Sequence, residues 1–198
     1  MLIGLSGKAR SGKDTVAQHL SHDAGFFHYA FATPLKDMIQ NIFGLSDEQM
    51  YGDLKETPDP ILGKTPRWLC QYIGGDIFRG IYEHVWAECA IRKYRELQKS
   101  HRETLRVVIS DVRYPNEFTA IRSAGGYLWR IIRTDYEEER TGNDEHESET
   151  GLDDLPDCAF DSVLTAASGD LKGLLEESEK ALDKTLQVHA VLSREEGK

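Results

Sequence analysis

A lysine, an aspartate and a threonine follow a glycine-flanked turn near the amino terminus, in an arrangement suited to phosphate chemistry. Gly7 and Gly12 enclose four residues, and Lys13 comes directly after the second glycine. Successive backbone N–H groups of such a turn point inward and bind phosphate oxygens, while the lysine ammonium reaches the outer phosphates. The turn therefore predicts a binding loop for ATP. The predicted loop residues are Gly7, Lys8, Ala9, Arg10, Ser11, Gly12, Lys13, Asp14 and Thr15.

The residue after the lysine departs from the commonest form of this loop. Asp14 stands where a serine or threonine hydroxyl usually contacts Mg²⁺, and Thr15 comes one residue later. Small-molecule phosphotransferases such as the nucleoside monophosphate kinases also carry a non-hydroxyl residue followed by threonine, so the variation favours a kinase over a motor protein or a switch GTPase. Mg²⁺ prefers oxygen ligands and keeps several waters, so Asp14 or Asp111 could hold the ion directly or through water.

Basic residues stand near glycines and strand ends in a chain whose formal net charge is −10. Phosphoryl transfer needs cations around the moving group, and a guanidinium matches phosphate in a bidentate way. Arg133 is therefore predicted to close over the transferring phosphate as a catalytic residue beside Lys13 and Asp14, although a solvated strand end would also explain it. Arg79 and Arg113 could bind an acceptor phosphate or form salt bridges. The basic residues so placed are Lys8, Arg10, Lys13, Lys36, Arg67, Arg79, Arg113, Arg130 and Arg133.

Strands and helices alternate along the sequence and would position these residues at one edge of a sheet. Apolar runs predict five strands, one before Gly7 and others at residues 26–31, 106–110, 127–132 and 162–166. Helical spacing predicts helices at residues 13–24, 34–43, 66–80, 82–100, 115–124 and 170–186. The alternation predicts an α/β fold in three layers, with a parallel sheet covered on both faces. Ligands would bind at the carboxyl ends of the strands.

Length, charge and cysteine content limit the class of protein. A chain of 198 residues is sufficient for one α/β domain, which we place at residues 1–190 with a tail at 191–198. Neither a bilayer-spanning apolar run nor a signal-peptide pattern occurs, and three widely spaced cysteines support neither a disulfide framework nor a zinc site, so a cytoplasmic location is expected. The negative net charge argues against nucleic-acid binding.

Five ordered motifs carry a family resemblance. They are SGKARSGKDT (6–15), FATPLKD (31–37), TPRWLCQYIGGDIFR (65–79) with a following Trp86, VVISDVRYPNE (107–117) and HESE (146–149). Together, over roughly residues 1–175, they resemble the deoxynucleoside monophosphate kinases of tailed bacteriophages. The resemblance implies a P-loop kinase fold with a five-stranded parallel sheet, a helical acceptor-binding insertion at 34–100 and a mobile lid at 134–157.

The same resemblance implies an enzyme that moves the γ-phosphate of ATP to a deoxynucleoside monophosphate with Mg²⁺, in the cytoplasm of an infected bacterium. Matching the motifs assigns acceptor binding to residues of the second and third segments, and Asp111 and Arg113 join this predicted set because they follow the end of the strand at 106–110. The whole set is Pro34, Leu35, Lys36, Gln71, Arg79, Asp111 and Arg113. Gly75 stands where many relatives carry threonine, so a polar contact from that position is absent here. The sequence leaves open whether the protein forms a homodimer.

Other activities stay open at this point. A P-loop kinase for phosphomevalonate or dephospho-coenzyme A would share the loop, and a non-kinase ATPase, a nucleotide-binding module or a scaffold would differ in class. Asp111 could instead cap a helix or pair with Arg113. Asp144, His146 and Glu149 could be imagined as metal ligands, but an exposed charged lid explains them better. His28 is expected at the surface near the first helix.

Overall fold

The computed structural model describes residues 1–101, 105–135 and 150–196, and these form two compact units. Unit 1 comprises residues 1–29 and 91–198, and unit 2 comprises residues 30–90. Within the described residues no helix has the length and apolar character needed to cross a membrane. All three cysteines are thiols, as the sequence predicts.

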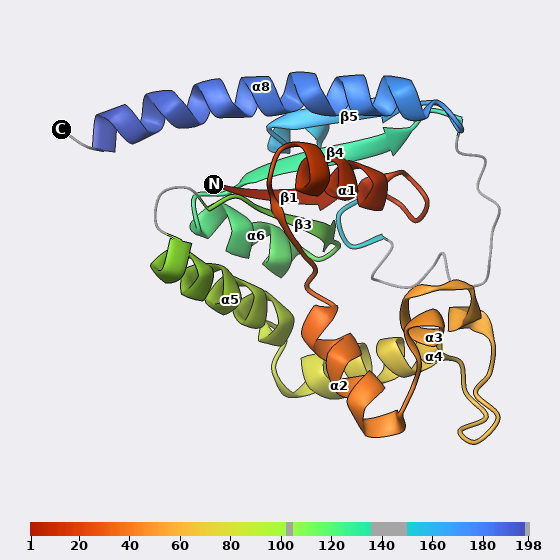
Figure 1. Ribbon diagram of the computed structural model, residues 1–198. Coiled ribbons are helices and arrows are strands. Elements are labelled where there is room, and N and C mark those ends of the chain that lie inside the picture. Colours follow the sequence, from red (N-terminus) through yellow and green to blue (C-terminus); the bar gives the residue numbers. More distant parts are fainter. Residues whose placement is uncertain (102–104, 136–149, 197–198) are drawn as a thin grey trace. The chain divides into compact units, whose positions relative to one another are not determined.

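A five-stranded sheet forms the centre of unit 1 (Figure 1). Its strand order is β2-β3-β1-β4-β5, and every neighbouring pair is parallel. The predicted α/β fold is therefore confirmed. The strands are β1 (Leu2–Ser6), β2 (Phe27–Tyr29), β3 (Val107–Val112), β4 (Tyr127–Arg133) and β5 (Ser162–Ala166).

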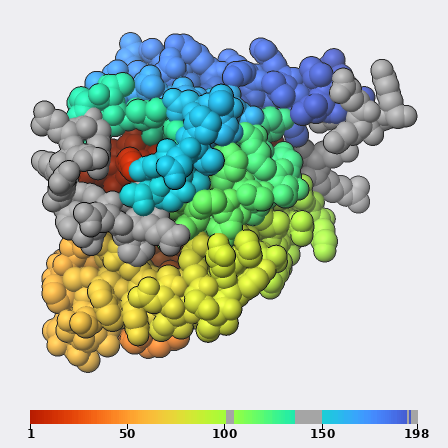
Figure 2. Space-filling view, turned by 180° about the vertical axis from the view of Figure 1, so that it is seen from behind, coloured from red at the N-terminus to blue at the C-terminus, as the bar shows by residue number. Residues whose placement is uncertain are grey.

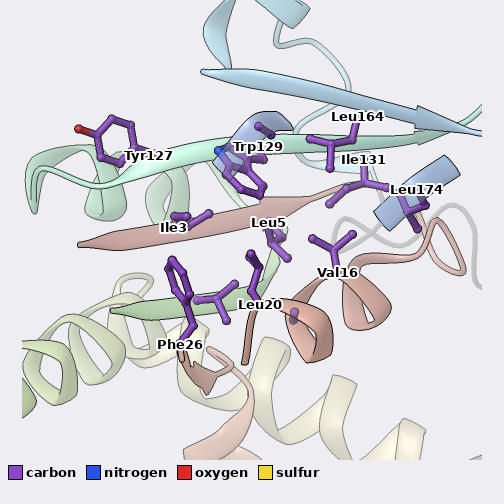
Figure 3. Close-up of a cluster of buried hydrophobic side chains, with 13 residues drawn as sticks. Ile3, Leu5, Val16, Leu20, Phe26, Tyr127, Trp129, Ile131, Leu164 and Leu174 are labelled. Carbon is purple, nitrogen blue, oxygen red and sulfur yellow. The ribbon is translucent and has the colours of Figure 1, made fainter. Parts of the chain in front are cut away.

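Helices α1 (Lys13–Asp23) and α8 (Leu171–Glu196) cover one face of this sheet. Alternate strand residues point to opposite faces, so Ile3 and Leu5 of β1 and Trp129 of β4 share the side that these helices cover. They pack against Val16 of α1 and Leu174 of α8 (Figure 3). Burial of this cluster is the main stabilising contribution to the three-layer arrangement.

Helix α6 (Pro115–Ser123) packs on the opposite face, against the intervening residues of β1 and β4. Gly4 is required there, because a Cβ would lie 2.4 Å from Ile121 Cδ1 and 3.0 Å from Leu128 Cδ2. The backbone of β1 therefore lies closer to α6 than a residue with a side chain at position 4 would allow.

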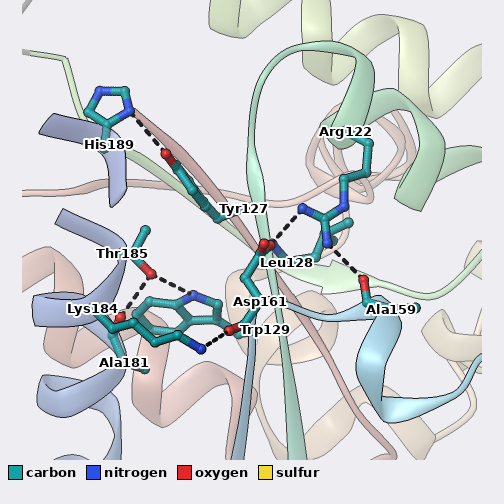
Figure 4. A network of polar contacts seen from close by, with 10 residues as sticks. All are labelled: Arg122, Tyr127, Leu128, Trp129, Ala159, Asp161, Ala181, Lys184, Thr185 and His189. Atoms are coloured by element: carbon teal, nitrogen blue, oxygen red, sulfur yellow. Dashed lines mark hydrogen bonds and ion pairs between the residues drawn. The ribbon is translucent and has the colours of Figure 1, made fainter. Parts of the chain in front are cut away.

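Polar contacts fix α8 and α6 to the edge of the sheet (Figure 4). Trp129 Nε1 donates to Thr185 Oγ1 at 3.2 Å, and Lys184 Nζ donates to the Asp161 carbonyl at 2.7 Å. The Asp161 carboxylate accepts from Leu128 N and from Arg122 of α6, each at 2.7 Å. Asp161 thus joins β4, α6 and α8 at one point.

Unit 2 contains short helices, and α5 (Val85–His101) begins in it and continues into unit 1. The indole of buried Trp86 donates from Nε1 to the Gly74 carbonyl at 3.0 Å, which fixes the π-helix η2 (Tyr72–Arg79) to the start of α5. The other elements are α2 (Thr33–Phe43), α3 (Asp47–Tyr51), η1 (Asp53–Glu56), α4 (Pro66–Gln71) and the π-helix η2 (Tyr72–Arg79).

Several predicted boundaries differ from the structure, among them the start of α5, which begins at Val85 and not at residue 82. The strand expected at 26–31 is reduced to β2, because Phe26 N donates to the Leu20 carbonyl at the end of α1 and Ala30 N donates to Thr33 Oγ1. The helix expected at 66–80 changes to a π-helix at Tyr72. The last helix continues to Glu196, through most of the expected tail, because its contacts with β4 and β5 hold it well beyond the predicted end.

Candidate active site

The turn between β1 and α1 has the backbone that the glycine spacing predicts. Gly7 has φ 151° and Gly12 has φ 100°, both conformations that favour glycine. A Cβ on Gly7 would lie 2.3 Å from the Ile131 carbonyl oxygen, so the loop passes directly against β4. Arg10 also has a positive φ, of 60°. Glycine therefore serves both the curl of the loop and its close contact with the sheet.

Lys13 begins α1, and its side chain folds back into the loop. The residue is buried, and Nζ donates to the carbonyl oxygens of Gly7 at 2.7 Å and Lys8 at 2.6 Å. Ser11 Oγ is also buried and has no hydrogen-bond partner among the described residues. A buried cation and an unpaired hydroxyl in one glycine loop suit a phosphate ligand, because phosphate oxygens accept from both.

A cavity of about 310 Å³ adjoins this loop at the carboxyl ends of β1, β3 and β4. Four of its lining side chains are cationic, which suits a polyanionic ligand. The lining residues are Ser6, Gly7, Lys8, Ser11, Val112, Arg113, Arg130, Ile131, Ile132, Arg133, Leu152 and Asp153. Arg113, from the fourth motif, and Arg133, predicted from its place at a strand end, thus lie at one cavity with the phosphate loop.

The segment after residue 149 closes one side of the cavity. Arg130 of β4 donates to the carbonyl oxygens of Leu152 and Leu155, each at 2.9 Å, and pairs with Asp157 at 2.8 Å. Residues 150–157 fall within the lid predicted at 134–157, and these contacts join the segment to β4. In the space-filling view the cyan residues around 150–160 lie on the surface beside the green of α6 (Figure 2). Phe160 packs edge-on against Phe118 of α6 there.

Arg133 ends β4, and its guanidinium is held from two directions. Nη2 donates to Ser168 Oγ, and Nε forms an ion pair with Asp135 Oδ1 at 3.4 Å. Desolvation opposes ionisation of Asp135, but its bond from Ser168 N and the nearby Arg133 outweigh this, so the pKa of Asp135 is lowered. The carboxylate is therefore ionised at neutral pH.

Asp14 and Asp111 both act electrostatically on His28. Asp14 is exposed on α1, Asp111 is half-buried near the end of β3, and His28 Nε2 lies 2.8 Å from Ser110 Oγ. Partial burial lowers the pKa of His28, while the two carboxylates act in the opposite direction. His28 keeps an exposed surface on β2, as the sequence predicts, and the charges of the two predicted metal-binding aspartates act on it. Their oxygen atoms fit Mg²⁺, although the described residues contain no group of three or more metal-ligating side chains.

The last residue of the motif at 107–117, Glu117, has a structural role. Glu117 is buried, and its Oε2 accepts from Arg113 N at 2.8 Å and Tyr114 N at 3.1 Å. The sequence indicated Asp111 as a candidate for a helix cap. In the structure the Glu117 carboxylate caps the start of α6. The cap fixes the backbone from which Arg113 extends to the cavity.

The remaining predicted acceptor residues belong to unit 2. Lys36 of α2 lies with Nζ 4.3 Å from the ring centre of Tyr51, and buried Leu35 packs against Gly74. Arg79 Nη1 donates to the Glu83 carbonyl at 3.2 Å, at the end of η2. Pro34 lies in the first turn of α2, and Gln71 ends α4.

Comparisons with known proteins decide the family. The family model described as deoxynucleotide monophosphate kinase matches residues 1–59 and 63–176. The chain belongs to this family. It is also 39% identical over 175 residues to a protein of Acanthamoeba polyphaga mimivirus named "Putative deoxynucleotide monophosphate kinase", covering 83% of this chain and 87% of that protein.

Membership of the deoxynucleotide monophosphate kinase family confirms the predicted class of activity. The protein is a phosphotransferase that uses ATP and acts on a deoxynucleoside monophosphate. The match ends at residue 176, near the start of α8, so most of that helix lies beyond the family model.

Several residues of this kinase site were missed or cannot be placed. The sequence identified Arg130 only as a basic residue, because a single arginine among the apolar residues of β4 indicates no particular partner. The sequence assigned no role to Asp153 or Asp135, because Asp153 pairs with Lys8 and Asp135 accepts from Ser168, each far away in the sequence. The predicted lid residues 136–149, including Asp144, His146 and Glu149, lie outside the residues that the structure describes.

Proposed function

We propose that this kinase transfers the γ-phosphate of Mg²⁺-bound ATP at the cavity beside residues 7–15. The observation that carries the proposal is the buried Lys13 ammonium inside a glycine loop, next to a cavity lined by Arg113, Arg130 and Arg133. The loop N–H groups and Lys13 hold the β- and γ-phosphates, and Ser11 Oγ donates to a phosphate oxygen.

In the proposed reaction an oxygen of the acceptor phosphate attacks the γ-phosphorus in line. The bond to the β-phosphate oxygen breaks, ADP leaves, and a deoxynucleoside diphosphate forms. Arg133 neutralises charge on the transferring group, and Arg113 holds a phosphate oxygen near it. Mg²⁺, when bound, would offset negative charge on the ATP phosphates. Asp14 and Asp111 would hold the ion, directly or through water.

Acceptor binding is proposed for residues of unit 2 and, within unit 1, for Asp111 and Arg113. Lys36 supplies a cation on α2, and Arg79 and Gln71 supply hydrogen-bond donors on the following helices. Pro34 and Leu35 shape the start of α2, where Leu35 fixes η2 through Gly74. We further propose a cytoplasmic location, on the basis of the three widely spaced thiols, and no nucleic-acid partner, on the basis of the negative net charge.

The test is ADP formation from ATP with each deoxynucleoside monophosphate in turn. The panel includes the ribonucleoside monophosphates, phosphomevalonate, dephospho-coenzyme A and a reaction without acceptor, each with Mg²⁺ and with EDTA. We expect ADP in step with a deoxynucleoside diphosphate, and its loss in EDTA. ADP formation independent of acceptor would contradict the proposed transfer, and full activity in EDTA would contradict the metal role of Asp14 and Asp111.

A further inference from the structure

Three residues form a closed set of contacts at the carboxyl end of β4. Ser168, in the turn between β5 and α8, donates from its backbone N–H to Asp135 Oδ1 at 2.7 Å. The same oxygen pairs with Arg133 Nε at 3.4 Å, and Arg133 Nη2 donates to Ser168 Oγ. One carboxylate oxygen therefore connects the end of β4 with the turn that follows β5.

The position of this turn is itself fixed close to the phosphate loop. Thr134 N donates to the Ala166 carbonyl at 3.0 Å, which continues the pairing of β4 with β5 up to the turn. Leu174, on the first turn of α8, packs so near Gly12 that a Cβ there would lie 2.5 Å from Leu174 Cδ2. The turn holding Ser168 thus lies between the sheet edge and a helix in contact with the loop.

These contacts restrict the guanidinium of Arg133 through two of its three nitrogen atoms. A guanidinium carries about five N–H donors, and the contacts of Arg133 with Asp135 and Ser168 engage Nε and Nη2. Arg133 also lines the cavity with Gly7 and Lys8. Among the residues that the structure describes, none accepts a hydrogen bond from Nη1 of Arg133, so this nitrogen and the second N–H of Nη2 are the donors that can reach a ligand in this cavity.

We infer that Asp135 is a positioning residue for Arg133: with Ser168 it holds the guanidinium in the orientation that contacts the transferring phosphate. The inference rests on the proposed catalytic role of Arg133. A long arginine side chain loses considerable rotamer freedom when it binds a ligand, and a partner that restricts it beforehand reduces this cost in the transition state. Asp135 itself does not contact substrate in this scheme.

A competing explanation is that Asp135 only fixes the turn after β5 through the Ser168 N–H. In that case removal of the carboxylate would affect the protein in the same way whether or not Arg133 is present. The two explanations therefore differ in the coupling between positions 135 and 133, which a double-mutant cycle measures.

The experiment compares wild type, Asp135→Ala, Arg133→Ala and the double variant, with kcat measured at saturating ATP and deoxynucleoside monophosphate. Asp183→Ala, which removes an exposed carboxylate from α8, is the matched control. We expect Asp135→Ala to lower kcat about tenfold with KM for ATP changed less than about twofold, and to add less than about twofold in the Arg133→Ala background. Asp135→Asn takes its place in the cycle if the alanine variant unfolds below the assay temperature.

The outcomes separate the inference from the function on which it rests. If Arg133→Ala alone keeps the wild-type kcat, the proposed catalytic role of Arg133 is wrong. If Arg133→Ala lowers kcat but Asp135→Ala does not, or lowers it equally in both backgrounds, the positioning role of Asp135 is wrong and the role of Arg133 stands. Thermal unfolding midpoints of all variants confirm that the comparison concerns folded protein.

Discussion

Lys8 Nζ and Asp153 Oδ2 form an ion pair between the phosphate loop and the segment that follows residue 149, and both residues line the same cavity. Their side chains are 41% and 50% exposed, so the pair contributes little to the free energy of unfolding. We expect the pair to lower the affinity for ATP instead, because the Asp153 carboxylate neutralises a cation that would otherwise face the phosphates of ATP.

Asp153→Asn is therefore expected to tighten ATP binding by about two- to fivefold at low ionic strength, and less at high salt, where exposed charges are screened. The dissociation constant for ATP, measured by isothermal titration at two salt concentrations, tests this. Asp154→Asn is the matched control, since it makes the same charge change at an exposed neighbour outside the cavity. Weaker ATP binding in Asp153→Asn would show that Asp153 holds Lys8 in a productive position.

Lys13→Ala is expected to lower kcat by at least about 10²–10³-fold, because it removes the cation placed inside the loop to balance developing phosphate charge. The fold should persist, since the loop backbone is fixed by Gly7 and Gly12. ADP formation and the thermal unfolding midpoint are the two measurements, with Lys172→Ala on the exposed side of α8 as control. Normal turnover by Lys13→Ala would remove the basis of the donor-site assignment.

Gly7→Ala is expected to cost about 2–4 kcal/mol of unfolding free energy and to abolish ATP binding. The new Cβ would lie 2.3 Å from a backbone oxygen of β4, which cannot move aside without disturbing the sheet. Urea denaturation measures the loss. Gly80→Ala is the control, because a Cβ on this glycine would meet no atom within 4 Å and its backbone is helical, so the substitution should be neutral or slightly stabilising.

Arg130→Ala is expected to lower the unfolding free energy by about 2–4 kcal/mol, because three charge-assisted hydrogen bonds to residues 152–157 are lost together. The segment should also become sensitive to limited proteolysis. Urea denaturation and protease cleavage of wild type and variant measure the two effects. An unchanged stability with an unchanged cleavage rate would mean that other contacts hold this segment.

The lowered pKa of His28 predicts a pH dependence of stability. The unfolded state binds a proton near pH 6.5, whereas the folded state binds it at a lower pH, so protonation favours unfolding in the interval between. The contribution is thus fully present above about pH 6.5 and is lost as the pH falls through the folded pKa. His28→Gln should flatten this part of the curve in denaturant titrations at successive pH values. An imidazole titration of His28 by NMR at or above the usual pKa would contradict the prediction.

The amino-acid sequence determined the elements of this kinase and the chemistry of its loop. Apolar runs and glycine spacing are local properties, so they predicted the five strands, the turn between β1 and α1, and the place of Lys13 at a helix start. The order of strands and helices then predicted that the sheet is parallel. The family motifs then gave the class of activity, which the comparisons confirm.

The tertiary structure alone decided which distant side chains meet. The pairs Lys8 with Asp153 and Asp135 with Ser168 join residues far apart in the chain, and Arg130 acquires its partners only when residues 150–157 fold back on β4. Local periodicity carries no information on such contacts, because they depend on strand order and on where each turn returns the chain. The sequence thus specified the phosphate loop, and the packing of β4 against the segments after it specified the cations and carboxylates around the cavity.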